Sequence, residues 1–440
     1  MTRSVNWRCP GLPRLFAGGL ALLLLSAPLA QAIEIDEVKS PEGIEAWLMY
    51  DPADPMITIS FSFEGGELQD PKGKEGLTGL MVDLLDKGAG NLERDEFQER
   101  LYATGAGLSI SSNSERVSGS LRVLPGEEEE PLELLALALS VPRFDQNDID
   151  LAKGVILSSL EDERNDPDRL GWERFGKEFY RDHPLATVTT AESVEAITRD
   201  DLVERHKALF ARSNLTIGAA GNIDQDELAR VMDKLFGALP AEAEVTPPAV
   251  PSPEFGIAVH QPHTRPQTSI TLVYPGLPSG SDDLYAANVL TNLLGGGMTS
   301  RLFHELREKR GLTYGAGASN AFSRDWGLVY VSTSTRAESA REALDMAKAV
   351  MSEAAQGEIT QEEVDDAKAY LKGSVVLGAL DSTSQIASTL VNLQRLNRPI
   401  DYLDRLDDLY DAVTLQDVKD IAAKLLSVEP AVLIVGQEDS

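Results

Sequence analysis

The second half of the chain repeats, in the same order, motifs found in the first half. Each half contains a Gly-Ala-Gly triplet and, further on, a capping box that begins with Thr and precedes a helical segment and an apolar strand. The matched pairs are the triplets at residues 105–107 and 315–317, the capping boxes at residues 198–201 and 414–417, and the strands at residues 214–221 and 431–436. Because every pair is separated by close to half of the chain, we infer an internal duplication.

Each half also follows the same order of expected strands and helices. Alternating apolar and polar residues predict an early strand, then a strand pair after the first helices, and later one long helix. The expected strands cover residues 56–63, 107–112 and 117–123 in the first half and 268–274, 314–320 and 327–333 in the second, and the long helices cover residues 147–164 and 361–378. This mixture predicts an α+β fold class with two duplicated domains, each a mainly antiparallel β-sheet covered by helices on one face.

A proline-rich segment separates the two halves. Residues 239–254 contain five prolines and show neither a helical nor a strand period, which is typical of an extended linker. We therefore predict an N-terminal domain at residues 33–238, a linker at residues 239–254 and a C-terminal domain at residues 255–440.

The N-terminus has the parts of a secretory signal peptide. Three arginines accompany an apolar stretch at residues 15–30, and Ala-Gln-Ala at residues 30–32 supplies a small-x-small cleavage pattern. We expect residues 1–32 to be removed near Ala32-Ile33 and the protein to reach the periplasm. The single cysteine, Cys9, lies in this segment, so no disulfide is expected afterwards. No later stretch is apolar enough to span a membrane, so no membrane association is expected after cleavage.

The charge of the chain limits its partners. The formal net charge is −31, and an acidic surface repels both nucleic acid and anionic lipid. We therefore expect no nucleic-acid partner. The charge suits a basic peptide or a basic protein, or it serves solubility alone.

One helix has the outline of a metal-binding helix without the ligands. Residues 75–85 read Glu-Gly-Leu-Thr-Gly-Leu-Met-Val-Asp-Leu-Leu, and this segment resembles the zinc helix of the pitrilysin/insulinase (inverzincin) metallopeptidases. The resemblance extends over essentially the whole chain after the signal. Its other landmarks are residues 144–167, His-Pro at residues 183–184, Gly-Gly-Gly-Met-Thr-Ser-Arg-Leu at residues 295–302 and Leu-Arg-Glu-Lys-Arg-Gly-Leu-Thr-Tyr at residues 306–314.

The resemblance implies where the metal ligands of the family would lie. Family members carry His-x-x-Glu-His on this helix and a third protein ligand, a glutamate, on a later helix. By this resemblance, Gly79 and Asp83 stand at the two histidine positions, Val82 at the glutamate that acts as the base, and Ser159 at the glutamate ligand. Zinc takes about four nitrogen, oxygen or sulfur donors, which a glycine and a valine cannot provide. We therefore expect a degenerate zinc site and no metal or other cofactor in this chain.

Two further residues of the family pattern are kept. The resemblance implies that Arg307 and Tyr314 point at the peptide bond to be cleaved, from the domain opposite the zinc. Attack on a peptide carbonyl builds negative charge on its oxygen, and fixed donors stabilise that oxyanion. A phenol hydroxyl can donate there, and a guanidinium is suited to gripping a substrate carbonyl.

These expectations together predict a divided active site. The first hypothesis is an exported, non-catalytic, substrate-orienting subunit of a heterodimeric metallopeptidase that cleaves peptides or unfolded polypeptides. Its partner is a sister chain with an intact His-x-x-Glu-His motif, which holds the zinc. The chain alone would hydrolyse nothing. The alternative is a catalytically dead structural or binding homologue of the same fold.

Other histidines give weaker signals. His304 and Glu308 lie one helical turn apart and would share a helix face, but no third ligand is evident, so a solvated face is the simpler interpretation. His260 and His263 flank a Gln-Pro pair and fit loop residues better than ligands.

Overall fold

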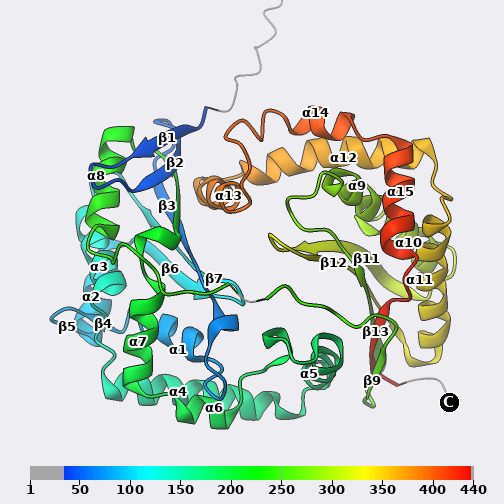
Figure 1. Ribbon diagram of the computed structural model, residues 1–440, viewed down its shortest axis with the longest axis horizontal. Coiled ribbons are helices and arrows are strands. Elements are labelled where there is room, and N and C mark those ends of the chain that lie inside the picture. The colour runs from blue at the N-terminus through cyan, green and yellow to red at the C-terminus, as the bar shows by residue number, and fades with distance from the viewer. Residues whose placement is uncertain (1–33, 248, 438–440) are drawn as a thin grey trace, which may run out of the picture. The chain divides into compact units, whose positions relative to one another are not determined.

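The computed structural model describes residues 34–247 and 249–437, and two large β-sheets organise this part of the chain (Figure 1). The predicted signal peptide lies outside the described residues. The first sheet has the order β1-β2-β8-β3-β7-β6, and the second has the order β11-β12-β10-β13-β9. In the described part, no helix is long and apolar enough to cross a membrane.

Both sheets are mainly antiparallel, as predicted. The first consists of β1 (Asp36–Lys39), β2 (Glu45–Tyr50), β3 (Ile57–Glu64), β6 (Gly107–Ser112), β7 (Arg116–Val123) and β8 (Leu215–Gly221). The second consists of β9 (Ala258–Pro262), β10 (Gln267–Pro275), β11 (Thr313–Phe322), β12 (Gly327–Arg336) and β13 (Ala431–Gly436). Each contains one parallel pair, β2 with β8 and β13 with β9. A small hairpin joins β4 (Gly88–Ala89) to β5 (Leu92–Glu93).

The helices follow the same order in the two halves. The first half contains α1 (Leu77–Asp83), α2 (Arg94–Thr104), α3 (Glu129–Ser140), α4 (Gln146–Asp162), α5 (Pro167–Tyr180), α6 (Ala191–Ala196), α7 (Arg199–Leu209) and α8 (Gln225–Phe236). The second half contains α9 (Leu284–Gly295), α10 (Arg301–Phe303), α11 (Ala340–Ala355), α12 (Gln361–Ala379), α13 (Thr383–Arg395), α14 (Leu406–Asp411) and α15 (Leu415–Leu426). The two predicted capping boxes are present at the starts of α7 and α15.

Each half has its own apolar core between its sheet and its helices. In the first half, Phe61 and Phe63 on β3 meet Phe236 on α8, and Phe63 also meets Phe210 edge-on with ring centroids 4.8 Å apart. Edge-to-face pairs at such distances are favourable beyond the area that they bury. The duplicated sequence thus builds two similar cores.

The halves exchange one helix each. Helix α5 of the first half packs on β9 and β13 of the second sheet, and helix α13 of the second half packs on β8, β3 and β2 of the first (Figure 1). Strand β3 is consequently buried on both faces, including its polar residues Thr58, Ser60 and Ser62. The expectation of helices on only one face of each sheet was therefore incomplete, because α13 covers the polar face of β3.

The proline-rich segment is extended and is hydrogen-bonded to the first half. The described residues between α8 and β9 form no helix or strand. The amide of Arg212 donates to the carbonyl of Pro240 at 2.9 Å, and that of Glu244 donates to Ala208 at 2.8 Å. The segment therefore lies along the first half, and the predicted domain boundaries at its ends stay a prediction.

Candidate functional site

Helix α1, which carries three of the predicted site positions, is held by a carboxylate outside the helix. The Asp70 carboxylate accepts hydrogen bonds from the amides of Gly76 and Thr78 at 3.0 and 3.1 Å and from the Thr78 hydroxyl at 2.5 Å. The first amides of a helix have no partner within the helix, so an acceptor at this end stabilises it. Asp70 therefore fixes the start of α1.

A buried arginine completes this support. The Arg205 guanidinium, from α7, donates to the Thr78 hydroxyl at 2.9 Å and to the Gly66 carbonyl at 3.0 Å. Burial raises the pKa of Asp70 to about 6, although its hydrogen bonds with Thr78 and the charge of Arg205 oppose the rise. Burial also lowers the pKa of Arg205. The scaffold around α1 is thus an intact, hydrogen-bonded network.

The side chains at the predicted zinc positions lie in different environments. Val82 is only 4% exposed and belongs to the core of the first half. Gly79 is half-buried, and a Cβ added there would lie 3.7 Å from Glu67 Oε1 and 3.8 Å from Ser112 Oγ, which is ordinary contact. The Ser112 hydroxyl donates to the same carboxylate at 2.6 Å.

Asp83 and Ser159 are exposed at the surface. Partial desolvation raises the pKa of Asp83, which Lys87 opposes and the nearby carboxylates of Asp86 and Glu67 reinforce. The Ser159 hydroxyl, on α4, donates to Glu163 at 3.1 Å. The serine therefore has a local partner one helical turn away.

These residues do not suit a zinc ion. One position has no side chain, a second is an aliphatic residue in the core, and the third and fourth are a carboxylate and a hydroxyl. Within residues 34–247 and 249–437, no group of three or more His, Cys, Asp or Glu residues could hold a metal ion. Without imidazole or thiolate donors, this end of α1 is a poor zinc site.

Arg307 lies on an unusual helical turn. Residues His304–Glu308 form a π-helical turn, labelled η5, directly after α10. The Arg307 guanidinium lies 4.7 Å from the centre of the Phe303 ring, and the side chain is otherwise exposed. Because π-helical turns cost stability and occur often at functional sites, this turn is a candidate binding element.

Tyr314 projects from an irregular edge strand. Among the strands that the structure describes, β11 pairs only with β12. Its register shifts between Thr313 and Ala316, so one extra residue is inserted there. The Thr313 hydroxyl lies 2.7 Å from the carbonyl oxygens of both Gly315 and Ser334 and holds the bulge by donating its single proton to one or the other. Bulges re-aim side chains, and the Tyr314 side chain is 83% exposed. Its hydroxyl is thus presented to solvent.

The six predicted site residues are divided between the two halves. Helix α1 packs against β6 of the first sheet and against α4, which carries Ser159. Turn η5 packs against β11 of the second sheet, so Arg307 and Tyr314 belong to the other half. These roles stay predictions. His304 Nδ1 lies 2.7 Å from Glu308 Oε2 in an exposed pair, which fits the solvated helix face expected from the sequence.

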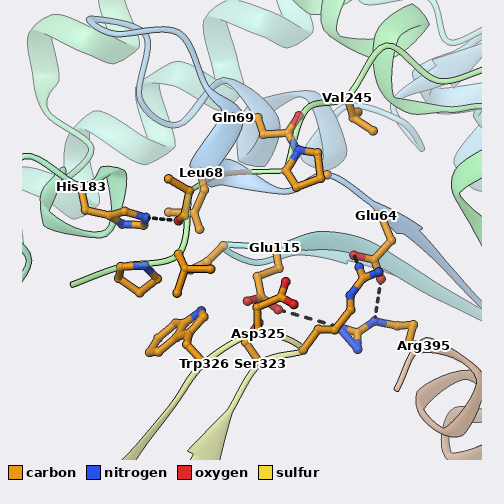
Figure 2. Close-up of a pocket in the computed structure, with 17 residues that line it drawn as sticks. Glu64, Leu68, Gln69, Glu115, His183, Val245, Ser323, Asp325, Trp326 and Arg395 are labelled. Carbon is orange, nitrogen blue, oxygen red and sulfur yellow. Dashed lines mark hydrogen bonds and ion pairs between the residues drawn. The ribbon is translucent and has the colours of Figure 1, made fainter. Parts of the chain in front are cut away.

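A separate cavity of about 100 Å³ lies beside the proline-rich segment (Figure 2). Four of its charged residues form ion pairs: Arg395, 9% exposed, pairs with Glu64 at 3.1 Å and Glu115 at 3.8 Å, and Arg324 pairs with Glu64 at 3.6 Å. His183 Nε2 lies 2.7 Å from the Ala249 carbonyl. None of the predicted site residues lines this cavity.

Sequence reasoning missed the residues that surround the helix. The Asp70–Thr78–Arg205 network and the Glu67–Ser112 pair next to Gly79 were not expected. Only Asp70 had a local signal, as a carboxylate shortly before a helix start. Ser112 and Arg205 come from distant segments, and only the fold brings them to α1.

Comparisons with known proteins agree with this fold. The sequence model of "Insulinase (Peptidase family M16)" matches residues 46–192, and that of "Peptidase M16 inactive domain" matches residues 196–371. The solved structure of a peptidase M16 inactive domain from Pseudomonas fluorescens is similar with a TM-score of 0.86 and 25% identity, covering 92% of this chain and 98% of that one.

Two curated bacterial relatives are similar over most of their length. A Helicobacter pylori protein called non-peptidase homolog YmxG is 26% identical, covering 83% of this chain and 85% of that protein. A Bacillus subtilis protein called uncharacterized zinc protease YmxG is 24% identical, covering 90% of this chain and 96% of that protein. Relatives of this chain thus include proteins described as inactive or as non-peptidases. With both family models matched in order along one chain, this protein belongs to the insulinase, or M16, peptidase family.

Proposed function

We propose that this protein is the non-catalytic, substrate-orienting subunit of an exported heterodimeric metallopeptidase. The observation that carries the proposal is the contrast between the two halves. The first half keeps a fully supported α1 without metal-binding side chains, whereas the second half presents Arg307 and Tyr314 in the open. If the chain no longer bound substrate, the bulge that exposes Tyr314 would have no evident function.

The chemistry of the two exposed residues suits a peptide in a partner's active site. The Tyr314 hydroxyl can donate a hydrogen bond to a carbonyl oxygen that gains negative charge during hydrolysis. The Arg307 guanidinium can hold a neighbouring carbonyl of the same peptide with two parallel N–H groups. The partner is a sister chain with an intact His-x-x-Glu-His motif, which would supply the metal chemistry.

The test is turnover by the co-expressed pair. Tyr314→Phe removes only the hydroxyl and is expected to lower kcat roughly 100-fold, the typical effect of losing one oxyanion donor. Arg307→Ala is expected to raise KM as well as lower kcat. Tyr102→Phe is the matched control, because Tyr102 is 89% exposed on α2, outside the proposed site.

Three results would count against this function. One is unchanged kcat and KM in both variants while the two chains still co-purify. Another is stoichiometric zinc, by elemental analysis, in the purified protein alone. The third is peptide hydrolysis by the protein alone.

A second candidate is a catalytically dead structural or binding homologue. The names of the similar proteins, a non-peptidase homologue and an inactive domain, favour it. It predicts that the Arg307 and Tyr314 variants behave like the native protein in every assembly that contains them. The turnover experiment therefore separates the two candidates.

Export to the periplasm is part of the proposal and rests on the N-terminal sequence. Its test is fractionation of cells that express the full-length protein, followed by N-terminal sequencing. Recovery from the periplasm with a new N-terminus near Ile33 would support export. Recovery of the uncleaved protein from the cytoplasm would contradict it.

A further inference from the structure

Helix α4 exposes an aliphatic face beside the end of α1. Leu151 and Val155 lie one turn apart on α4 and are 55% and 64% exposed. They line a groove of about 250 Å³ together with Ala152 and Ile156 and with four charged residues, Asp83, Lys87, Arg94 and Asp148. Helical spacing puts Ser159 one turn beyond Val155 on the same face. The groove therefore adjoins two of the predicted zinc positions.

Only some of the charged residues around this groove have an ion-pair partner. Lys87 Nζ lies 2.7 Å from Asp86, and an Arg94 guanidinium nitrogen lies 3.1 Å from the Asp148 carboxylate. Asp83 joins no ion pair with any other residue that the structure describes. The carboxylate of Glu67 adds further negative potential at Asp83. The groove thus has an aliphatic floor and, at one end, a carboxylate that forms no ion pair and whose surrounding charges are Lys87, Asp86 and Glu67.

The size of the groove decides between a peptide and a protein surface. A stable protein–protein interface buries about 1,200–2,000 Å² in total. A groove of about 250 Å³ with two exposed aliphatic residues has room for one or two side chains rather than for a surface of that extent. The charge at its end favours a positively charged neighbour on the same ligand.

We propose that the groove between α1 and α4 binds a short peptide segment in a turned rather than fully extended conformation, with an aliphatic side chain on Leu151 and Val155 and an adjacent lysine or arginine at Asp83. The groove would anchor and select the peptide, where catalytic relatives cut it. The proposal rests on the proposed substrate-orienting function and adds the class of substrate.

The experiment measures peptide binding to the purified protein by fluorescence anisotropy, without a sister chain. Three labelled hexapeptides differ only at two adjacent central positions: Leu-Arg, Ala-Arg and Leu-Glu. The Leu-Arg peptide should bind roughly 10-fold more tightly than Ala-Arg, from the buried aliphatic area. It should bind about threefold to fivefold more tightly than Leu-Glu, the scale of one exposed ion pair.

Variants of the groove test its two parts separately. Val155→Glu should remove the preference for Leu-Arg over Ala-Arg, whereas Leu377→Glu, a change at a 74% exposed leucine on α12, should leave it intact. Asp83→Asn should abolish the preference for Leu-Arg over Leu-Glu, and Asp83→Lys should reverse it. The reversal would be hard to obtain from a merely destabilised protein.

Three outcomes would overturn the proposal. The first is that the three peptides bind equally well. The second is that Val155→Glu leaves the peptide affinity unchanged. The third is that Val155→Glu loses its association with the sister chain while its peptide affinity does not change. The last result would assign the groove to the subunit interface. Failure of the proposed function would instead appear as unchanged turnover in the Arg307 and Tyr314 variants, which this binding assay does not involve.

Discussion

The exchange of helices between the halves makes Gly218 a sensitive position. Gly218 lies on β8 under α13, and a Cβ there would lie 2.4 Å from the Ala387 carbonyl oxygen and 3.0 Å from the Val391 amide nitrogen. These are backbone atoms, which cannot rotate away as a side chain can. Nine in ten Cβ contacts in proteins are longer than 3.4 Å. Helix α13 would therefore have to move by about 1 Å to bring the added Cβ to an ordinary distance from the Ala387 carbonyl oxygen.

The cost of Gly218→Ala can be built from two parts. Overpacking costs about 1–3 kcal/mol. A displaced α13 would also strain the buried hydrogen bond between Thr58 and Thr383, 3.0 Å long, and that from Gln394 to the Ile217 carbonyl, 2.8 Å long. Each such bond contributes about 1 kcal/mol. We therefore expect Gly218→Ala to lower the free energy of unfolding by about 2–4 kcal/mol.

Two other glycine-to-alanine variants serve as a graded comparison. At Gly171 on α5, a Cβ would meet the Val435 side chain at 2.7 Å and Gln261 Cβ at 3.3 Å, so side-chain adjustment should make the loss smaller. At Gly154, in the middle of α4, a Cβ would meet nothing within 4 Å. Gly154→Ala should therefore raise stability by up to about 1 kcal/mol through helix propensity.

Urea unfolding followed by circular dichroism measures this series. The midpoints should rise in the order Gly218→Ala, Gly171→Ala, native protein, Gly154→Ala, with similar denaturant slopes. If Gly218→Ala were as stable as Gly154→Ala, α13 would not lie on β8, and the described exchange of helices would be wrong.

Three further predictions concern buried charge and the lost metal site. Burial lowers the pKa of His206 to about 4, so stability should fall by up to about 3 kcal/mol as the pH drops from about 6.5 to 4, and urea midpoints of His206→Gln should lack that fall. Burial alone would raise the pKa of Glu363, but hydrogen bonds from Arg301 and Thr360 lower it to about 2. Glu363→Gln should therefore cost about 2 kcal/mol at pH 7, and its difference from the native protein should shrink as the pH falls below about 4.5, in the same unfolding assay. Gly79→His, Asp83→His and Ser159→Glu together should create stoichiometric zinc binding in elemental analysis, whereas Gly79→His alone should not; absence of zinc in the triple variant would show that these positions do not converge.

Much of the fold was predictable because its signals are local. Alternation of apolar and polar residues identified β3, β10 and the strand pairs β6–β7 and β11–β12. Capping boxes that begin with Thr identified the starts of α7 and α15. The short strands β1 and β2 were missed. With four and six residues, they give too few positions for a reliable period.

The candidate site was less predictable because its geometry depends on distant contacts. The sequence identified Tyr314 but not the bulge that exposes it, which depends on pairing with β12 and on the Thr313 hydroxyl. It identified Val82 at the position of the family's catalytic glutamate but not its burial in the core. The exposed aliphatic face of α4 was also missed, because an apolar residue at helical spacing ordinarily indicates packing.

The sequence by itself determined the duplication, the order of strands and helices and the loss of metal-binding side chains, because each depends on residue identity or short-range spacing. Only the tertiary structure decided which helix covers which sheet. Thr58, Ser60 and Ser62 have the alternation of a solvated strand face, yet α13 buries them from more than 300 residues away. The two halves are copies with equivalent helices, so a helix could pack on its own half or on the other half. Contacts between residues far apart in the sequence decide this, and nothing in the local sequence shows that the copies exchange their helices.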